Sequence, residues 1–227
     1  MPATPPQKRH PYNQWAPDAR ALDLVGDKWT LLIVRDLAGG PRRFVELQRV
    51  LPGISTEQLR SRLNRMVADG LLTRQRYREV PPRVDYELTA SSRDLLPVLG
   101  ALARWGYEWS WTAPRDGEAI DIGAILRIAP GLVYPPPGLK GVAELRVVQP
   151  DGATRHYTLS VSGGGVQISE TEASSIDVRI SGNESDWIAA LGPESDRSRL
   201  SIDGDERLAG ILLDGVTTVA ERRRQAA

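Results

Sequence analysis

The segment from Ile54 to Gly70 constrains the fold more than any other part of the chain. Ser55 is a favoured N-cap, and Gln58 three residues later completes a capping box, so a helix begins here and Gly70 ends it. Four apolar side chains recur at helical spacing and form one stripe: Leu59, Leu63, Met66 and Val67. The other face is short, polar and basic, which is the surface that a recognition helix presents to the major groove of DNA.

A predicted hairpin follows this helix directly. Residues 71–77 are predicted to form a strand with arginines at 74 and 76, and residues 84–88 alternate well enough for a second strand. The Pro-Pro pair at 81–82 blocks ladder pairing and stiffens the turn between them. A hairpin in this place is a wing, and Arg78 and Arg83 at its tip are positioned to reach phosphate or the minor groove.

Helical periodicity also marks the segments on either side. We expect helices over 18–25, 29–38 and 44–51, each closed by glycine or by Pro-Gly, and a longer helix over 91–111. This last helix carries more apolar surface than one helix buries within its own domain. The surplus predicts a dimer interface.

Charge is distributed unevenly along a chain whose formal net charge is zero. Residues 1–112 contain 17 Lys and Arg against 12 Asp and Glu, whereas residues 113–227 contain 12 against 17. Residues 42–83 alone contain 10 against 4. Such a local excess is what a polyanion-binding surface requires, although a solvated basic face is the alternative on charge alone.

The composition excludes several classes of site. The chain has no cysteine, which excludes disulfides, zinc–thiolate sites, cysteine nucleophiles and thiol-based sensing. His10 and His156 do not stand at a metal-ligand spacing, so we expect no metal site. The sequence also shows no catalytic grouping, and we therefore expect no cofactor and no enzymatic activity. No apolar run approaches the roughly 18–20 residues that span a bilayer, and the N-terminus lacks a secretory signal. We therefore expect a cytoplasmic protein without membrane contact.

Six blocks of sequence occur in coherent order: GDKWTLLIVRDL at 26–37, GPRRFVEL at 40–47, LPGIS at 51–55, DGLLTR at 69–74, YREVPPRVDYELT at 77–89 and WG at 105–106. Together they resemble the HxlR family of bacterial winged helix-turn-helix regulators over about 15–110. The resemblance implies a homodimer that binds double-stranded operator DNA with two-fold related half-sites, through the helix and the wing. Many members sense oxidants through an early cysteine. Ala16 stands at that position here, so a signal must enter elsewhere.

The expected DNA contacts lie on the recognition helix, before the preceding helix and in the wing. Gln58 and Ser61 should approach base edges, and the arginines of the helix should contact bases or backbone. The two arginines before the helix at 44 either anchor phosphate or are surface charges only. The predicted set is Arg42, Arg43, Thr56, Gln58, Ser61, Arg62, Arg65, Arg78 and Arg83.

Composition and turn signals divide the chain into an arm over 1–14, the winged-helix domain over 15–112, a linker over 113–120 and a second domain over 121–227. In the second domain we expect strands over 142–148, 154–161, 166–169, 175–181 and 200–202, with short helices at 186–191 and 208–213. This order predicts an α+β fold, with helices against one face of an antiparallel sheet.

The stretches at 177–192 and 201–212 resemble the sterol carrier protein 2-like (SCP2-like) fold, over about 118–220. The resemblance implies a sheet and helices around an apolar tunnel for a hydrophobic ligand. Ordinary core packing is the alternative for every side chain that would line it. These side chains are Leu159, Val161, Ile168, Trp187, Leu191, Leu200, Leu208, Ile211 and Leu212.

These features predict a dimeric DNA-binding transcription regulator that responds to an apolar small molecule. Ligand in the second domain would change the spacing of two recognition helices, and so the affinity for DNA. One alternative is a constitutive repressor whose second domain is a structural or dimerisation module without ligand. Another is a lipid or metabolite carrier whose winged helix serves protein contacts, which the basic segment 42–83 argues against.

Overall fold

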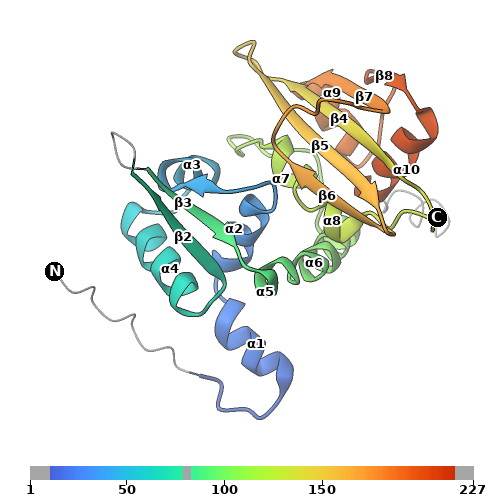
Figure 1. Ribbon diagram of the computed structural model, residues 1–227. Coiled ribbons are helices and arrows are strands. Elements are labelled where there is room, and N and C mark those ends of the chain that lie inside the picture. The colour runs from blue at the N-terminus through green and yellow to red at the C-terminus, as the bar shows by residue number, and fades with distance from the viewer. Residues whose placement is uncertain (1–10, 79–82, 218–227) are drawn as a thin grey trace. The chain divides into compact units, whose positions relative to one another are not determined.

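The computed structural model describes residues 11–78 and 83–217 (Figure 1). Most of the predicted N-terminal arm and the Pro-Pro pair of the wing therefore lie outside the described residues. The contacts divide the chain into two compact units, with the division after Leu95. Each unit is described below by itself.

The N-terminal unit contains five helices and three strands within its described residues. The helices are α1 (Pro17–Val25), α2 (Thr30–Leu37), α3 (Phe44–Val50), α4 (Thr56–Ala68) and α5 (Ala90–Arg93). The strands are β1 (Arg42–Arg43), β2 (Leu72–Tyr77) and β3 (Arg83–Leu88). They form an antiparallel sheet in the order β1-β3-β2. The predicted helices and hairpin of a winged helix are present, with bounds shifted by one or two residues.

Helix α4 begins as its sequence predicts. Ser55 Oγ accepts a hydrogen bond from the Gln58 N–H at 3.1 Å, and Gln58 Oε1 accepts one from the Ser55 N–H at 3.1 Å. The pair satisfies two backbone donors that the first turn of a helix leaves open. Three members of the predicted apolar stripe, Leu59, Leu63 and Met66, are fully buried. The capping box therefore determines where α4 begins, and the buried stripe determines which face of α4 packs against the core.

The single helix predicted over 91–111 is wrong. The structure has α5 up to Arg93 and a separate helix, α6, over Leu96–Trp109. Pro97 explains the break: it has no N–H to donate to the carbonyl of Arg93, and its ring crowds that carbonyl. At the start of α6 the missing donor costs nothing, because the first-turn N–H groups have no helical partner.

The C-terminal unit begins with α6 and adds four more helices and five strands among its described residues. The helices are α7 (Ile122–Leu126), α8 (Ala129–Leu132), α9 (Glu184–Leu191) and α10 (Glu206–Thr217). The strands are β4 (Gly141–Val148), β5 (Thr154–Ser162), β6 (Gly165–Ser169), β7 (Val178–Asn183) and β8 (Ser201–Gly204). Helix α8 was not predicted from the sequence.

The strands form one sheet in the order β6-β5-β4-β7-β8. The sheet is mixed, not antiparallel as predicted, because β4 and β7 run parallel. Segment 170–177 makes this possible by crossing from β6 over the outer face of β5 and β4 to reach β7 (Figure 1). Thr158 Oγ1 holds this crossing by donating a hydrogen bond to the Thr171 carbonyl at 2.6 Å.

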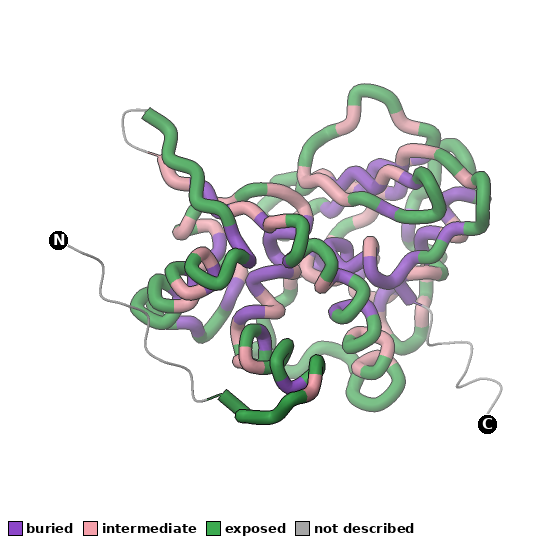
Figure 2. The backbone as a smooth tube through the Cα atoms, turned by 60° about the horizontal axis from the view of Figure 1, so that its bottom comes forward, coloured by how far each residue is buried: buried purple, intermediate pink, exposed green. Residues whose placement is uncertain are grey.

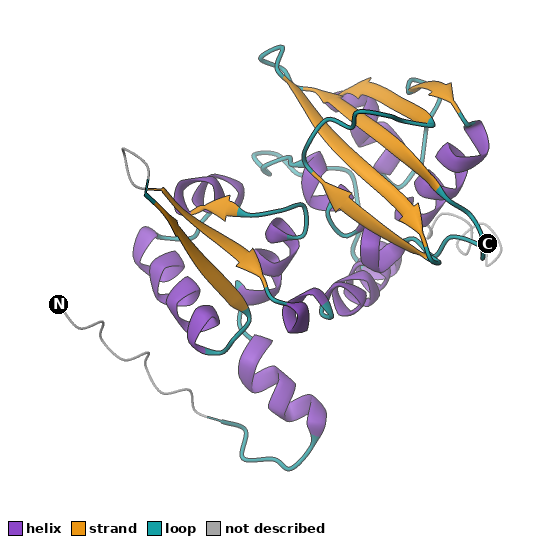
Figure 3. Cartoon of the chain, in the orientation of Figure 1, coloured by secondary structure: helices purple, strands orange, loops and turns teal. Residues whose placement is uncertain are grey.

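Helices lie against the other face of this sheet, as predicted (Figure 3). Side chains from β4, β5 and β7 meet those of α7, α9 and α10 in one buried cluster. Trp187 is its largest member, and its indole Nε1 donates a hydrogen bond to the Arg146 carbonyl at 2.9 Å. The C-terminal unit therefore has its own hydrophobic core between the sheet and these helices.

Candidate nucleic-acid interface

Helix α4 and the hairpin β2–β3 present an exposed polar surface on the N-terminal unit. Strand β2 is exposed beyond Leu72 and carries arginines at 74 and 76 (Figure 2). The exposed side chains of α4 include Thr56, Glu57, Gln58, Arg60, Ser61 and Asn64. Three of the predicted DNA contacts, Thr56, Gln58 and Ser61, are therefore accessible. Arg60 and Asn64 share this surface, although the predicted set leaves them out.

Arg62 and Arg65 are less accessible than the prediction assumed. Arg62 lies on the flank of α4, where its Nη1 is 2.9 Å from Asp27 Oδ2. Asp27 in turn accepts hydrogen bonds from the N–H groups of Trp29 and Thr30 at the start of α2. Arg65 is partly buried. The structure thus gives Arg62 a role in joining α4 to α2, and contact of either arginine with DNA stays a prediction.

A buried carboxylate organises the base of the wing. Asp85 is 2% exposed, Arg83 Nε donates to it at 2.9 Å, and Arg43 Nε lies 4.0 Å away. The hydrogen bond from Arg83, with the charges of both arginines, holds the pKa of Asp85 below its usual value although burial acts in the opposite direction. Both guanidinium groups remain accessible, since the arginine side chains are 37% and 50% exposed. Two of the predicted phosphate contacts are therefore pre-oriented.

The remaining predicted contacts lie around this base. Arg42 is partly exposed on β1, and Arg78 is exposed just beyond β2. The Arg83 guanidinium also lies 5.0 Å from the centre of the Tyr77 ring. Together these residues place positive charge along the hairpin as far as its structure is described.

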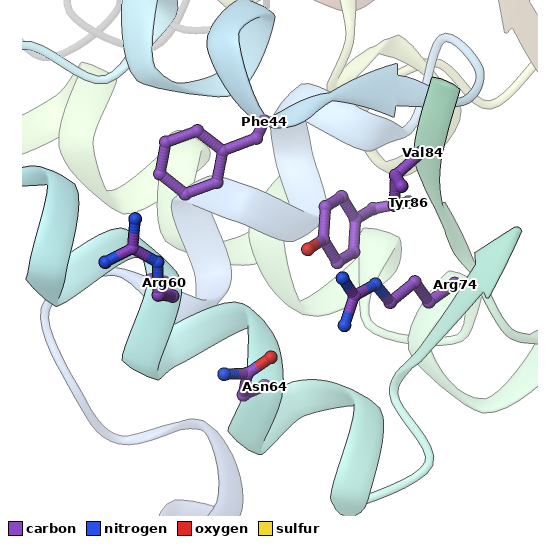
Figure 4. A pocket seen from close by; sticks show the side chains of 6 residues that line it. All are labelled: Phe44, Arg60, Asn64, Arg74, Val84 and Tyr86. Carbon is purple, nitrogen blue, oxygen red and sulfur yellow. The ribbon is translucent and has the colours of Figure 1, made fainter. Parts of the chain in front are cut away.

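A groove of about 330 Å³ separates α4 from the wing (Figure 4). Its lining residues come from α3, α4, β2 and β3: Phe44, Arg60, Asn64, Arg74, Val84 and Tyr86. The Arg74 guanidinium lies 5.9 Å from the centre of the Tyr86 ring. The sequence analysis did not find this groove, because it depends on how the hairpin packs beside the helix.

Comparison with known proteins identifies the family of this part of the chain. Residues 24–113 match the model of the HxlR-like helix-turn-helix family. An HTH-type transcriptional regulator of Synechocystis sp. is 42% identical over 93 residues, which are 41% of this chain and 69% of that protein. The chain belongs to the HxlR-like helix-turn-helix family. The predicted resemblance to this family, placed over about 15–110, is confirmed over residues 24–113.

A second relative of this HxlR-like chain matches over a similar length of sequence. The HTH-type transcriptional regulator YkvN of Bacillus subtilis is 35% identical over 96 residues, 42% of this chain and 81% of that protein. Among solved structures, the redox regulator HypR in its reduced form is 35% identical and covers 40% of this chain and 90% of that chain, with a TM-score of 0.39. The HxlR-like match includes α6, whereas the contacts assign α6 to the C-terminal unit. The family match ends at residue 113 and the contacts divide the chain after Leu95, so the predicted domain end at residue 112 stays a prediction.

The side chains predicted to line a ligand tunnel are in or beside the core of the C-terminal unit. Ile168 packs against the edge of this core, and Ile211 on α10 is partly exposed. The others belong to the buried cluster: Leu159, Val161, Trp187, Leu191, Leu200, Leu208 and Leu212. Core packing, the alternative that the sequence left open, accounts for their positions. A tunnel remains a prediction.

The sequence analysis predicts that the chain does not enter a membrane. In segments 11–78 and 83–217, no helix combines the length and the apolar character that crossing a bilayer demands.

A second buried carboxylate lies on the outer face of the C-terminal sheet. Glu144 on β4 is fully buried and accepts hydrogen bonds from Arg179 Nε at 2.8 Å and Arg146 Nε at 3.0 Å. His156 Nδ1 lies 3.0 Å from its other oxygen. Glu172, paired with Arg146, brings a third metal-ligating side chain near the Glu144 and His156 pair. Two guanidinium groups on Glu144 oppose binding of a cation, so the cluster fits an ion-pair network better than a metal centre.

We expect Glu144→Gln to destabilise the C-terminal unit by about 1–3 kcal/mol at neutral pH, because charge-assisted hydrogen bonds are lost. Burial acts to raise the pKa of Glu144, but hydrogen bonds from Arg179, His156 and Arg146 outweigh it and lower the pKa to about 2. The stabilisation is therefore present above the unfolded-state pKa, near 4.5, and disappears as the pH falls towards 2.

Urea unfolding of both proteins at pH 7 and pH 3 tests this expectation. The difference in unfolding free energy should shrink at the lower pH. Glu172→Gln is the matched control: this side chain is 64% exposed, so its ion pair with Arg146 contributes little. Equal effects of the two substitutions on the unfolding free energy would contradict the conclusion that Glu144 is the main acceptor of this ion-pair network.

Proposed function

We propose that this HxlR-like chain is a transcription regulator that binds double-stranded DNA as a homodimer, with α4 in the major groove and the wing beside it. The observation that carries the proposal is the exposed polar face of α4 next to a hairpin rich in arginine. The relatives named above are HTH-type transcriptional regulators, which supports it.

The size and chemistry of α4 suit a major groove. The helix has 13 residues, so it is roughly 20 Å long, and the groove is about 12 Å wide. Gln58, Ser61 and Asn64 offer amide and hydroxyl groups, which can both donate to and accept from base edges. The arginines of the wing would contact the phosphates, where register is fixed but no sequence is read.

An unpartnered apolar stripe on α6 supports the homodimer. Its members recur at helical spacing and are each at least half exposed: Val98, Leu102, Trp105 and Trp109. Contiguous exposed apolar surface of this kind marks a protein–protein contact. A two-fold dimer formed through it would present two copies of α4, and its operator would contain two related half-sites.

The C-terminal unit enters the proposal as a structural module of the regulator. The side chains that would line a tunnel are packed against one another in its core. This packing favours the sequence-based alternative of a module without ligand over a sensor of apolar molecules in this unit. The tryptophan experiment in the Discussion separates the two.

Selection of duplexes from a random library by the purified chain, followed by fluorescence anisotropy on the selected DNA, tests the function. We expect a sequence with two-fold related half-sites, bound with strong salt dependence. Asn64→Ala should weaken binding by about 5- to 150-fold at one base position and relax specificity there. Arg78→Ala should weaken all duplexes similarly and reduce the salt dependence.

Arg20→Ala on the exposed surface of α1 is the control for loss of one positive charge. It should leave the affinity for the selected duplex within about twofold. If Asn64→Ala, Arg62→Ala and Arg65→Ala all bind as the wild type does, the assignment of α4 as the recognition helix is wrong.

A further inference from the structure

The groove between α4 and the wing has a chemistry that DNA binding alone does not require. Phe44, Val84 and Tyr86 contribute apolar side chains to its lining together with Arg60, Asn64 and Arg74, as Figure 4 shows. A DNA phosphate needs hydrogen-bond donors and has no use for aromatic walls. Apolar walls with a few convergent polar groups are instead typical of small-molecule sites, which have volumes of about 300 Å³ or more.

The polar groups of the groove select an anion. Arg60 extends from α4, Arg74 from β2, and Asn64 adds an amide (Figure 4). Among the described residues that line the groove, none is acidic. Arg60 is paired at 2.9 Å with Glu57, but both side chains are more than half exposed, and such surface pairs are weak. A ligand carboxylate can replace this partner and gain a forked hydrogen bond from the guanidinium group.

The aromatic walls select a planar apolar body. Tyr86 is 6% exposed and Phe44 is half-buried, so both rings are held by the domain before any ligand arrives. Aromatic rings pack favourably against another ring in offset or edge-to-face arrangements. Preformed walls also reduce the entropy that a ligand must lose on binding.

We propose that this groove binds a small aromatic carboxylate, and that this ligand and DNA exclude one another. The second part rests on the proposed function, because Arg60 and Asn64 belong to the face of α4 that would enter the major groove. A bound carboxylate neutralises positive charge there and fills the space between helix and wing. The bound ligand therefore weakens DNA binding, and by linkage bound DNA weakens ligand binding to the same extent. A chain without cysteine thereby has a site for a chemical signal.

Titration of the full chain with benzoate and with 1-naphthoate, without DNA, tests the site itself. Chemical shifts of the labelled protein, or heat, report binding. We expect 1-naphthoate to bind more tightly than benzoate, and benzamide, which lacks the charge, to bind at least about tenfold more weakly than benzoate. Binding of benzamide as tight as that of benzoate, or no binding of either acid at millimolar concentration, would overturn the proposal.

Two matched variants locate the site. Arg74→Ala should weaken 1-naphthoate binding by about tenfold or more. Arg76→Ala removes the same charge from the same exposed strand, but Arg76 does not line the groove, so this variant should bind as the wild type does. Equal losses in both variants would show attraction by net charge only, and would overturn the assignment of the site to this groove.

Competition with the selected duplex tests the coupling. Because the two exclude one another, the apparent Kd of the duplex should rise with ligand concentration, by about tenfold when 1-naphthoate is present at about ten times its own Kd. If 1-naphthoate binds but the duplex affinity does not change, the coupling is wrong. If Arg74→Ala weakens duplex binding while neither acid binds the wild type, the groove contacts the DNA backbone and binds no aromatic carboxylate, so the proposal fails. A chain that binds 1-naphthoate and no duplex would contradict the proposed function and leave the site standing.

Discussion

Gly100→Ala should destabilise the C-terminal unit by about 3 kcal/mol or more. Gly100 lies on α6, and a Cβ atom there would be 1.9 Å from the carbonyl oxygen of Gly131 and 2.3 Å from its carbonyl carbon. These are backbone atoms of α8, so they cannot turn aside as the end of a side chain could. The two helices would have to separate, and the contacts between them would be lost.

Other contacts show why separation is costly. Arg104 Nη1 on α6 donates a hydrogen bond to the same Gly131 carbonyl at 3.1 Å, and its guanidinium lies 5.5 Å from the centre of the Tyr134 ring. A Cβ atom at Gly131 would lie 2.0 Å from the Leu96 carbonyl oxygen, so neither helix has room to adjust. The contact requires glycine on both sides.

Gly106→Ala is the matched control on the same helix. A Cβ atom there would meet only Ser110 Oγ, at 3.8 Å, and alanine favours the helix by about 1 kcal/mol over glycine. We expect this variant to be as stable as the wild type or slightly more so. Urea unfolding of the full chain, followed by tryptophan fluorescence and circular dichroism, measures both. If the two substitutions had the same effect, the close approach of α6 to α8 would be disproved.

The parts of the fold that the sequence predicts are those that local signals determine. The capping box at Ser55 and Gln58 and the stripe behind it define α4 without reference to the rest of the chain. The hairpin and the C-terminal strands follow from alternation and turn residues. The break before α6 was also within reach, because Pro97 stands inside the helical pattern and prolines end helices.

The rest depends on pairings between distant residues. The parallel pairing of β4 with β7 follows from the path of segment 170–177, which no local pattern specifies. His156 reads as an isolated strand residue until the register of β4 and β5 brings it within 3.0 Å of Glu144.

At the candidate interface the exposed face of α4 was predictable. The ion pair of Arg62 with Asp27 was not, because it depends on how α2 packs against α4. The groove was hidden for the same reason, since its walls come from four separate elements.

Trp187→Ala should cost the C-terminal unit about 3–5 kcal/mol, because it removes the largest fully buried side chain and leaves a cavity. The substitution also leaves the Arg146 carbonyl without the indole N–H that now lies 2.9 Å from it. Trp187→Phe keeps most of the buried apolar surface and loses this hydrogen bond and part of the ring volume, so it should cost less, about 1–3 kcal/mol.

The size of the first effect decides between the two roles of the C-terminal unit. In a packed module, the indole contacts its neighbours on every side, and its removal forfeits those contacts together with the burial. In a ligand tunnel, one side of the indole would face an existing cavity, and its loss would cost far less. Urea unfolding of the wild type and both variants gives the comparison. A cost below about 1 kcal/mol for Trp187→Ala would contradict the packed module and favour an apolar ligand beside Trp187.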